Sequence, residues 1–491
     1  MSDCNDFRHV GIDLKIQPGL QWTSVIMRKE YRMKISLLAG ILLLLVMTGA
    51  AVHVAAQDAK DSPSAIAAKQ VIQELVAGQF EKVEALYDAQ MAAALPPGKL
   101  GASWPELIKQ AGAFQAITST QTSQSQGLQI VKMECKFENA VLDATVVFNA
   151  DGKLGGLSFR PHQVPAAPWT APAYANQSLF SEQPLSVVNG KYDLPGTLTV
   201  PNGEGPFPGV VLVQGSGPED QDETLGPNKP LKDLAWGLAS RGIAVFRYTK
   251  RTEKYTVQSS DDPMRLTVED ETISDARAAV ALLAKQAKVN PKQVFLLGHS
   301  LGAYLAPRIA TGDAEIAGII MLAANVRPLE KVVLEQIHYL AAMNGAPTEA
   351  EQKNIDAAED AAKQIESPSL KPEDKIVFLG ATTYGAYWLD LRAYDPLKTA
   401  AKLKIPILIF QGGRDYQVTP SNFTAWSDAL ANTKNVTLRT YPDLDHLFMH
   451  GSGPSKPSDY ARPDHVSAEV VESIATWILP SEKPGSLAKP Q

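Results

Sequence analysis

The chain has 491 residues, of which 45% are hydrophobic, 20% charged and 7% aromatic, so it can bury a large core and is neither disordered nor collagen-like. Its formal net charge is −7, and a mildly acidic chain without a basic block argues against nucleic acid as a partner. The only cysteines are Cys4 and Cys135, which excludes cysteine-rich zinc modules, iron–sulfur sites and a disulfide framework.

An apolar run at 35–47 follows four basic residues and precedes a Val-Ala-Ala sequence that ends at Ala56. This pattern is typical of a signal peptide. It predicts that residues 1–56 form the signal peptide region, that cleavage follows Ala56, and that the protein is secreted or periplasmic. Residues 1–26 have neither the basic nor the apolar pattern that belongs ahead of such a signal, which favours a start of translation at Met27 or Met33.

A retained membrane anchor is the alternative interpretation of the same run. A spanning helix needs about 20 apolar residues, whereas Gly49 and His53 interrupt this one soon after it ends. We therefore expect no stable membrane insertion after signal cleavage.

Residues 57–160 are predicted to form a small α+β domain. Apolar residues recur every three or four positions from Pro63 to about Met91, as in amphipathic helices. Strand patterns punctuated by turn residues follow at 114–124, 128–137, 140–149 and 154–159. The domain contains no histidine and no catalytic set, so we expect a docking or substrate-gathering module, with Cys135 packed as a small hydrophobic residue.

A proline-rich segment, 161–184, separates this domain from the rest of the chain. Proline at this density stiffens the backbone and removes hydrogen-bond donors, which predicts an extended linker. The last residues, 481–491, are expected to be a flexible tail.

Residues 185–480 alternate short apolar runs with helical stretches, the pattern of a mostly parallel, doubly wound sheet covered on both faces. The segment 185–201 is predicted to be an antiparallel hairpin at the sheet edge. The segment at about 327–402 lacks a strong strand pattern and contains helical periodicity, which predicts a helical lid inserted over the sheet.

The sequence Gly-His-Ser-Leu-Gly at 298–302 matches the G-x-S-x-G pattern. A buried-strand pattern precedes it and a helix pattern follows, so Ser300 falls on the sharp strand-to-helix turn of a nucleophile elbow. The two glycines are expected because a side chain at either position would clash in so tight a turn. His299 is expected to face away from Ser300.

A serine hydroxyl needs a base to remove its proton, and the base needs a carboxylate to orient it. Asp415 follows the predicted strand 405–410, and His446 follows the predicted strand 436–441. We therefore predict that Ser300, Asp415 and His446 form a catalytic triad, in the chain order usual for this fold.

Other residues compete for two of these roles. Asp443 and Asp445 are rivals for the acid, but they share a loop with the base and would more naturally cap it. His450 and His465 are rivals for the base and lie farther past the strand end.

Attack on a carbonyl places negative charge on oxygen, which preorganised N–H groups must receive. The backbone N–H of Leu301, at the helix start, is one predicted donor of this oxyanion hole. The backbone N–H of Ser216 is the other, from a glycine-rich loop after the strand 209–214. A phosphate site is the alternative for this loop, but no G-x-x-x-x-G-K-[ST] motif is present.

These motifs resemble the α/β-hydrolase superfamily. Two further stretches, 217–224 and 247–252, are similar to bacterial esterases near the dienelactone-hydrolase and serine-aminopeptidase-like branch. Residues 63–160 are similar to a small domain of unknown function that often precedes such esterases. The resemblance implies hydrolysis of carboxylic esters with short acyl chains, without a cofactor. Relatives commonly carry His where this chain has Gln214, so the oxyanion loop is held differently here.

Aromatic and basic residues near the predicted site have two interpretations. Tyr387 and Trp388 either line an acyl pocket or form the core of the lid. Tyr248, with Lys250 and Arg251, either contacts a substrate carboxylate or holds a loop.

The sequence therefore predicts a serine esterase that acts on a small-molecule ester through an acyl-enzyme, with no metal and no cofactor. A peptidase of the same fold is the first alternative. A binding protein with a vestigial hydrolase scaffold is the second, and the complete triad argues against it.

Overall fold

The computed structural model describes residues 62–479, except for 126, 163–166, 256–261, 344 and 348. The predicted signal peptide region, 1–56, and the predicted tail, 481–491, lie outside the described residues. The chain divides into two compact units at Pro165 and Ala166, and each unit is described by itself.

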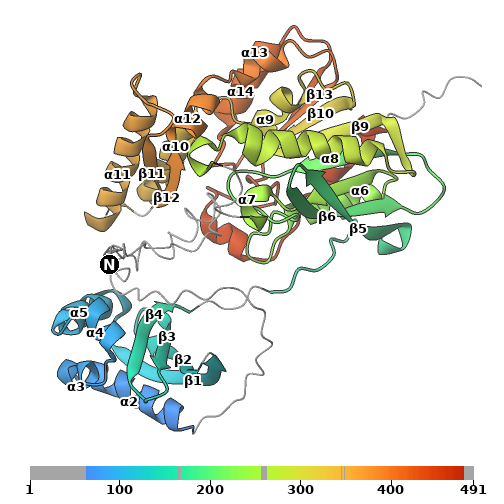
Figure 1. Ribbon diagram of the computed structural model, residues 1–491. Helices are drawn as coiled ribbons and strands as arrows, with labels where there is room; N and C mark the ends of the chain where they lie inside the picture. Colours follow the sequence, from blue (N-terminus) through green and yellow to red (C-terminus); the bar gives the residue numbers. More distant parts are fainter. Residues whose placement is uncertain are drawn as a thin grey trace, which may run out of the picture. The chain divides into compact units, whose positions relative to one another are not determined.

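In the described part of the first unit, four helices precede an antiparallel sheet of strand order β1-β2-β3-β4 (Figure 1). Its elements are α2 (Pro63–Val76), α3 (Phe80–Glu84), α4 (Ala89–Ala94), α5 (Lys99–Ala111), β1 (Phe114–Ser125), β2 (Leu128–Phe137), β3 (Val141–Phe148) and β4 (Leu154–Pro161).

Helix α2 shows why these residues fold locally. The Ser62 side chain accepts a hydrogen bond from the Ala65 amide, which caps the helix start. The buried residues of α2 recur at helical spacing and face a core that also holds Cys135. Burial raises the pKa of the Cys135 thiol to about 12, so this cysteine is a packed hydrophobic residue.

The second unit is built on an eight-stranded sheet of order β14-β13-β10-β9-β7-β8-β6-β5. Its strands are β5 (Phe180–Asn189), β6 (Tyr192–Pro201), β7 (Phe207–Val213), β8 (Ala244–Tyr248), β9 (Val289–His299), β10 (Ile316–Leu322), β13 (Ile407–Gly412) and β14 (Val436–Tyr441). Strand β6 is antiparallel to both of its neighbours, and the other pairs are parallel. This mostly parallel sheet confirms the predicted fold class, including the hairpin at its edge.

Helices cover both faces of this sheet (Figure 1). They are α6 (Pro230–Ala239), α7 (Arg251–Lys254), α8 (Ser274–Ala284), α9 (Leu301–Ala310), α14 (Pro420–Leu430) and α15 (Ala468–Ile478). Val210 and Leu212 of β7 pack in the core with α6 and α15, whereas Val211 and Val213 pack with α8 and α9. Because successive side chains of a strand point to opposite faces, both faces must be apolar, which explains the continuous apolar runs in the sequence.

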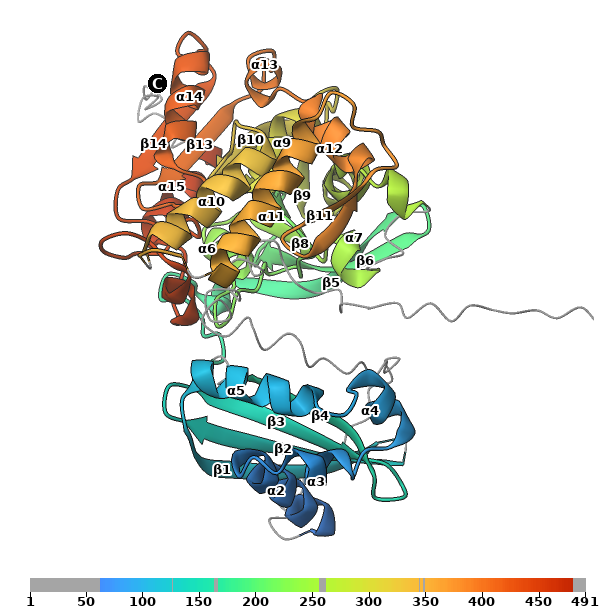
Figure 2. The ribbon, with the colours of Figure 1, turned by 90° about the vertical axis from the view of Figure 1, so that its left-hand side faces the viewer.

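The segment between β10 and β13 is mainly helical and lies on one side of the sheet domain (Figure 2). It comprises α10 (Leu329–Met343), α11 (Glu349–Glu366), β11 (Lys375–Phe378), β12 (Ala381–Tyr384), α12 (Gly385–Arg392) and α13 (Pro396–Ala400). The two-stranded antiparallel hairpin β11–β12 is a feature that the sequence pattern did not predict. We call residues 327–402 the helical insertion.

The proline-rich segment differs from the expected linker from Trp169 onward. Trp169 donates from Nε1 to Asp233 at 2.9 Å and packs edge-on against Trp236. Strand β5 already begins at Phe180, before the predicted boundary at 184. Trp169 is held by aromatic packing against α6, which proline density alone does not reveal.

Within the part of the chain that the structure describes, no helix is long and apolar enough to cross a membrane.

Candidate active site

Ser300 lies between the end of β9 and the start of α9 in a strained backbone conformation, with φ 53° and ψ −113°. A Cβ atom on Gly298 would lie 2.3 Å from the carbonyl of Gly302, and one on Gly302 would lie 2.4 Å from the carbonyl oxygen of Val213. The close approach of backbone therefore requires both glycines. A non-glycine residue with positive φ is uncommon and costs free energy, as expected for a nucleophile elbow.

The imidazole of His446 and the carboxylate of Asp415 form a buried pair, with Nδ1 2.7 Å from Oδ2. The two residues are 1% and 2% exposed. The Asp415 carboxylate is fixed on its other side, because Oδ1 accepts from the amides of Gln417 at 2.8 Å and Val418 at 2.9 Å. Since a carboxylate only accepts, Nδ1 carries the proton of the neutral imidazole and Nε2 is left as the base.

The Nε2 atom of His446 is buried and has no hydrogen-bond partner. It therefore makes no hydrogen bond to Ser300 in this structure, although both residues line the same pocket. Catalytic hydrogen bonds are often long without substrate and tighten when it binds. The three predicted triad residues, Ser300, Asp415 and His446, follow β9, β13 and β14 in that order. These parallel strands bring their carboxyl ends to one edge of the sheet.

The competing acids and bases have other partners. Asp445 accepts from the amides of Leu447 and Met449 and so stabilises the loop after the base. His450 contacts the hydroxyl of Ser467, and His465 contacts the carboxylate of Asp233.

The oxyanion loop, residues 214–216, follows β7 and lies against the elbow. A Cβ atom on Gly215 would lie 2.8 Å from Oε1 of Glu223 and 3.3 Å from the Cβ of Ser300, so a side chain here would push these neighbours away. The carbonyl of Gly215 accepts from the buried Lys250 ammonium at 2.8 Å, and Lys250 also donates to Glu271 at 2.8 Å. Gln214 donates to the carbonyl of Tyr248.

The two predicted oxyanion donors belong to residues that lie beside Ser300. Leu301 is the first residue of α9, where amides have no partner within the helix. Leu301 and Ser216 both line a pocket with Ser300. The helix start also favours negative charge through its dipole.

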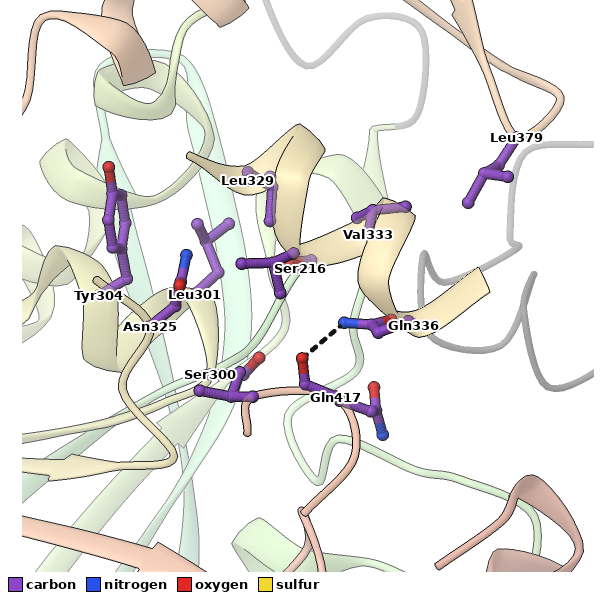
Figure 3. A pocket seen from close by; sticks show the side chains of 12 residues that line it. Ser216, Ser300, Leu301, Tyr304, Asn325, Leu329, Val333, Gln336, Leu379 and Gln417 are labelled. Carbon is purple, nitrogen blue, oxygen red and sulfur yellow. Dashed lines mark hydrogen bonds between the residues drawn. The ribbon is translucent and has the colours of Figure 1, made fainter. Parts of the chain in front are cut away.

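This pocket is mainly apolar and is covered by α10 (Figure 3). Leu329, Val333 and Gln336 of α10 project toward it, and the Gln336 amide donates to the carbonyl of Gln417 at 3.0 Å. The full lining is Ser216, Ser300, Leu301, Tyr304, Asn325, Leu329, Val332, Val333, Gln336, Leu379, Gln417 and Val418. The cavity volume is about 30 Å³, enough for a few water molecules.

The chain is 38% identical over 408 residues to the esterase EstD of Thermotoga maritima, an alignment that covers 83% of this chain and 93% of EstD. The chain belongs to the family of this esterase. Residues 229–452 match the family described as serine aminopeptidase, S33. Residues 68–157 match a family described as a protein of unknown function, DUF3887. These matches confirm the resemblance drawn from the motifs, including that of the N-terminal domain.

Solved structures with similar folds include two enzymes of 13–17% identity. Est1E from Butyrivibrio proteoclasticus, solved with ferulic acid, is 17% identical with a TM-score of 0.40, covering 60% of this chain and 98% of that one. The acylaminoacyl peptidase of Pyrococcus horikoshii is 13% identical with a TM-score of 0.43, covering 76% of this chain and 58% of that one.

The structure bears on the two interpretations of Tyr248, Tyr387 and Trp388. Tyr248 is 1% exposed and packs against Phe246. The Tyr387 hydroxyl donates to Glu271 at 2.8 Å, and the Trp388 indole donates to Thr383 at 2.8 Å. None of the three is among the residues that line the two pockets at Ser300. Their rings are used in packing, which was the alternative interpretation.

The basic residues beside Tyr248 also hold structure together. Lys250 fixes the oxyanion loop, and Arg251 forms a buried ion pair with Asp275 at 2.6 Å.

Two acidic residues at the site were not predicted from the sequence. Glu219 and Glu223 line the pocket that contains Ser300 and His446. Burial, together with the nearby charge of Glu223, raises the pKa of Glu219 well above its usual value. Both acids lie within the stretch 217–224 that carried the family resemblance, so that stretch was the available signal.

Proposed function

We propose that this protein is a serine esterase that hydrolyses carboxylic esters of short acyl chains through an acyl-enzyme at Ser300. The contact between Asp415 and His446 is the single observation that carries the proposal. It fixes the tautomer of the imidazole and leaves a buried, unpartnered Nε2 at the pocket that Ser300 lines.

In the first half-reaction the Ser300 hydroxyl attacks the ester carbonyl and transfers its proton to Nε2 of His446. The imidazolium that forms is stabilised by Asp415 and then gives the proton to the leaving alcohol. In the second half-reaction a water molecule transfers a proton to the same nitrogen and attacks the acyl-enzyme. The acid is released and Ser300 regains its proton.

The negative charge on the carbonyl oxygen is received by the amides of Leu301 and Ser216. Two features preorganise them: the first amide belongs to the start of α9, and the loop of the second is fixed by the hydrogen bond from Lys250 to Gly215. Removal of one such donor typically slows turnover by about 10²–10³-fold.

The apolar pocket beneath α10 is the proposed acyl site. Its lining includes Leu329, Val332 and Val333 of α10, and we expect these side chains to limit the length of the acyl chain. Acyl specificity therefore depends on the packing of α10.

Peptidase activity is the second candidate, favoured by the description of the family that residues 229–452 match. Aryl acetates and butyrates are compared with aminoacyl anilides on one preparation of the full chain. The proposal predicts much faster turnover of the esters. Preferential cleavage of the anilides would replace it with the peptidase.

Substitution of the nucleophile tests whether the site is catalytic at all. Ser300→Ala is expected to lower kcat by about 10⁶-fold, as for other triad nucleophiles. A folded variant with substantial activity would contradict the assignment and would favour a binding protein on a hydrolase scaffold.

We also propose that the protein is exported, with cleavage of its signal peptide after Ala56. The basic residues and the apolar run at 35–47 support this proposal. N-terminal sequencing of the protein from the producing cells is expected to begin at Gln57. A chain that keeps residues 35–47 and sediments with membranes would instead support an anchor.

A further inference from the structure

A second carboxylate–imidazole pair lies beside the proposed triad. Glu223 belongs to the loop between β7 and α6, and His299 is the residue before Ser300. Nδ1 of His299 is 3.0 Å from Oε1 and 3.1 Å from Oε2 of Glu223. The two residues are 7% and 5% exposed, and neither has a role in the mechanism above.

The hydrogen-bond partners determine which nitrogens of His299 carry protons. Nε2 is 2.9 Å from the backbone carbonyl oxygen of His446, and because a carbonyl only accepts, Nε2 is protonated. Nδ1 of His299 faces the Glu223 carboxyl group, so a proton lies between them. Because Nε2 is also protonated, the pair is either an imidazolium beside a carboxylate or a neutral imidazole beside a protonated acid. Burial lowers the pKa of His299, but the Glu223 charge and hydrogen bond raise it more, which favours imidazolium beside carboxylate.

Glu223 also holds the oxyanion loop, since its Oε1 accepts from the Gly215 amide at 2.8 Å. His299 lies directly against the general base, with the rings of His299 and His446 4.7 Å apart. One carboxylate and one imidazole thus connect the oxyanion loop, the nucleophile elbow and the backbone of the general base.

The backbone of Glu223 is itself held in an unfavourable conformation, with φ 53°. A bulky residue stays there only where its surroundings fix it. Asp222, its neighbour, forms a buried ion pair with Arg247 at 2.8 Å and a partly buried one with Lys229 at 2.9 Å. The loop is therefore built to direct the Glu223 carboxylate inward.

We propose that Glu223 and His299 form a positioning pair that holds the oxyanion loop, Ser300 and His446 at their working distances. This role rests on the proposed esterase function. The pair takes no proton from substrate, because both N–H groups of His299 are engaged with Glu223 and with the His446 carbonyl.

Variants of Glu223 test separately the length of its side chain, which we call its reach, and its charge. Glu223→Gln keeps the reach, since the amide oxygen can accept from Gly215 and the NH₂ group can donate to a neutral His299. It is expected to keep kcat within about tenfold, the cost of exchanging charge-assisted for neutral hydrogen bonds. Glu223→Ala removes all these bonds and is expected to lower kcat by about 10²-fold, with little change in KM, as for a small misplacement of reacting groups.

Glu223→Asp keeps the charge but shortens the reach by one methylene, and it serves if the alanine variant fails to fold. It is expected to lower kcat by more than Glu223→Gln does. Asp275→Ala is the matched control, because it removes a buried carboxylate from an ion pair with Arg251 outside the pockets at Ser300. It should lower thermal stability and leave kcat of the folded enzyme unchanged.

The outcomes separate this role from the proposed function. If the unmodified chain does not hydrolyse esters, the proposed function fails. If it does, and folded Glu223→Ala or Glu223→Asp turns over ester at the unmodified rate, the positioning role is overturned. A glutamine variant as impaired as the alanine variant would also overturn it, because charge rather than connection would then matter.

Discussion

Asp445, the residue before the proposed general base, has a carboxyl group whose protonation depends on folding. It is 2% exposed, and its Oδ1 accepts from the amides of Leu447 at 3.0 Å and Met449 at 3.1 Å. Burial raises its pKa from 3.8 to about 7; the Met449 amide opposes this rise, and the charge of Asp415 adds to it. In the folded chain the group therefore keeps a proton that the unfolded chain loses at much lower pH.

The sign of the pH dependence follows from this difference. Between about pH 4 and pH 7 the unfolded chain binds fewer protons at Asp445 than the folded chain, so the free energy of unfolding falls as pH rises. A shift of about three pKa units at 1.36 kcal/mol each corresponds to about 4 kcal/mol lost by pH 8. The loss is absent below the unfolded pKa, where both states are protonated.

Asp445→Asn should remove this dependence. The amide oxygen can accept from the same two backbone amides and cannot ionise. Denaturant unfolding of both proteins from about pH 4.5 to pH 8 should show the variant gaining about 3 kcal/mol relative to the unmodified chain across this range, because about 1 kcal/mol is already lost at pH 4.5. Parallel curves would refute the reasoning. kcat should stay close to that of the unmodified chain, because Asp415 orients His446, and a loss of about 10³-fold or more would assign that role to Asp445.

Three further predictions concern the triad, the acyl pocket and the N-terminal domain. Asp415→Asn should lower kcat by about 10⁴-fold, because the amide favours the wrong tautomer of His446, and steady-state kinetics would show it; an unimpaired variant would contradict the triad. Val333→Ala should raise kcat/KM for butyrate or hexanoate esters relative to acetate by about tenfold, since each buried methylene contributes about 0.8 kcal/mol; an unchanged acyl-length profile would place the acyl group elsewhere. Deletion of 57–160 should leave the hydrolysis of small esters largely unchanged, and complete loss in a folded protein would mean that this domain completes the site.

Most elements of both units could be predicted from the sequence because their signals are local. The strands of the small domain, the alternating elements of the sheet and the elbow at Ser300 depend on periodicity, glycine spacing and turn residues within a few positions. The pairing of Asp415 with His446 was predictable for a related reason: the carboxyl ends of parallel strands meet at one edge.

The features that the sequence did not reveal depend on contacts between distant segments. Glu223 is 76 residues from His299, and no pattern within the loop indicates that its carboxylate points toward the elbow rather than into solvent. Tyr387 is an aromatic residue of the kind that often lines pockets. Only its hydrogen bond to Glu271 shows that it belongs to the packing of the helical insertion. The docking of Trp169 against α6 likewise depends on a partner 67 residues away in Trp236.

Labelling with a fluorophosphonate tests the central claim most directly, because the reagent phosphonylates only an activated serine. Peptide mass mapping of the labelled full chain is predicted to place the adduct on Ser300, with labelling abolished in Ser300→Ala and strongly slowed in His446→Ala. An adduct on a different residue, or equally fast labelling without the imidazole of His446, would contradict the account.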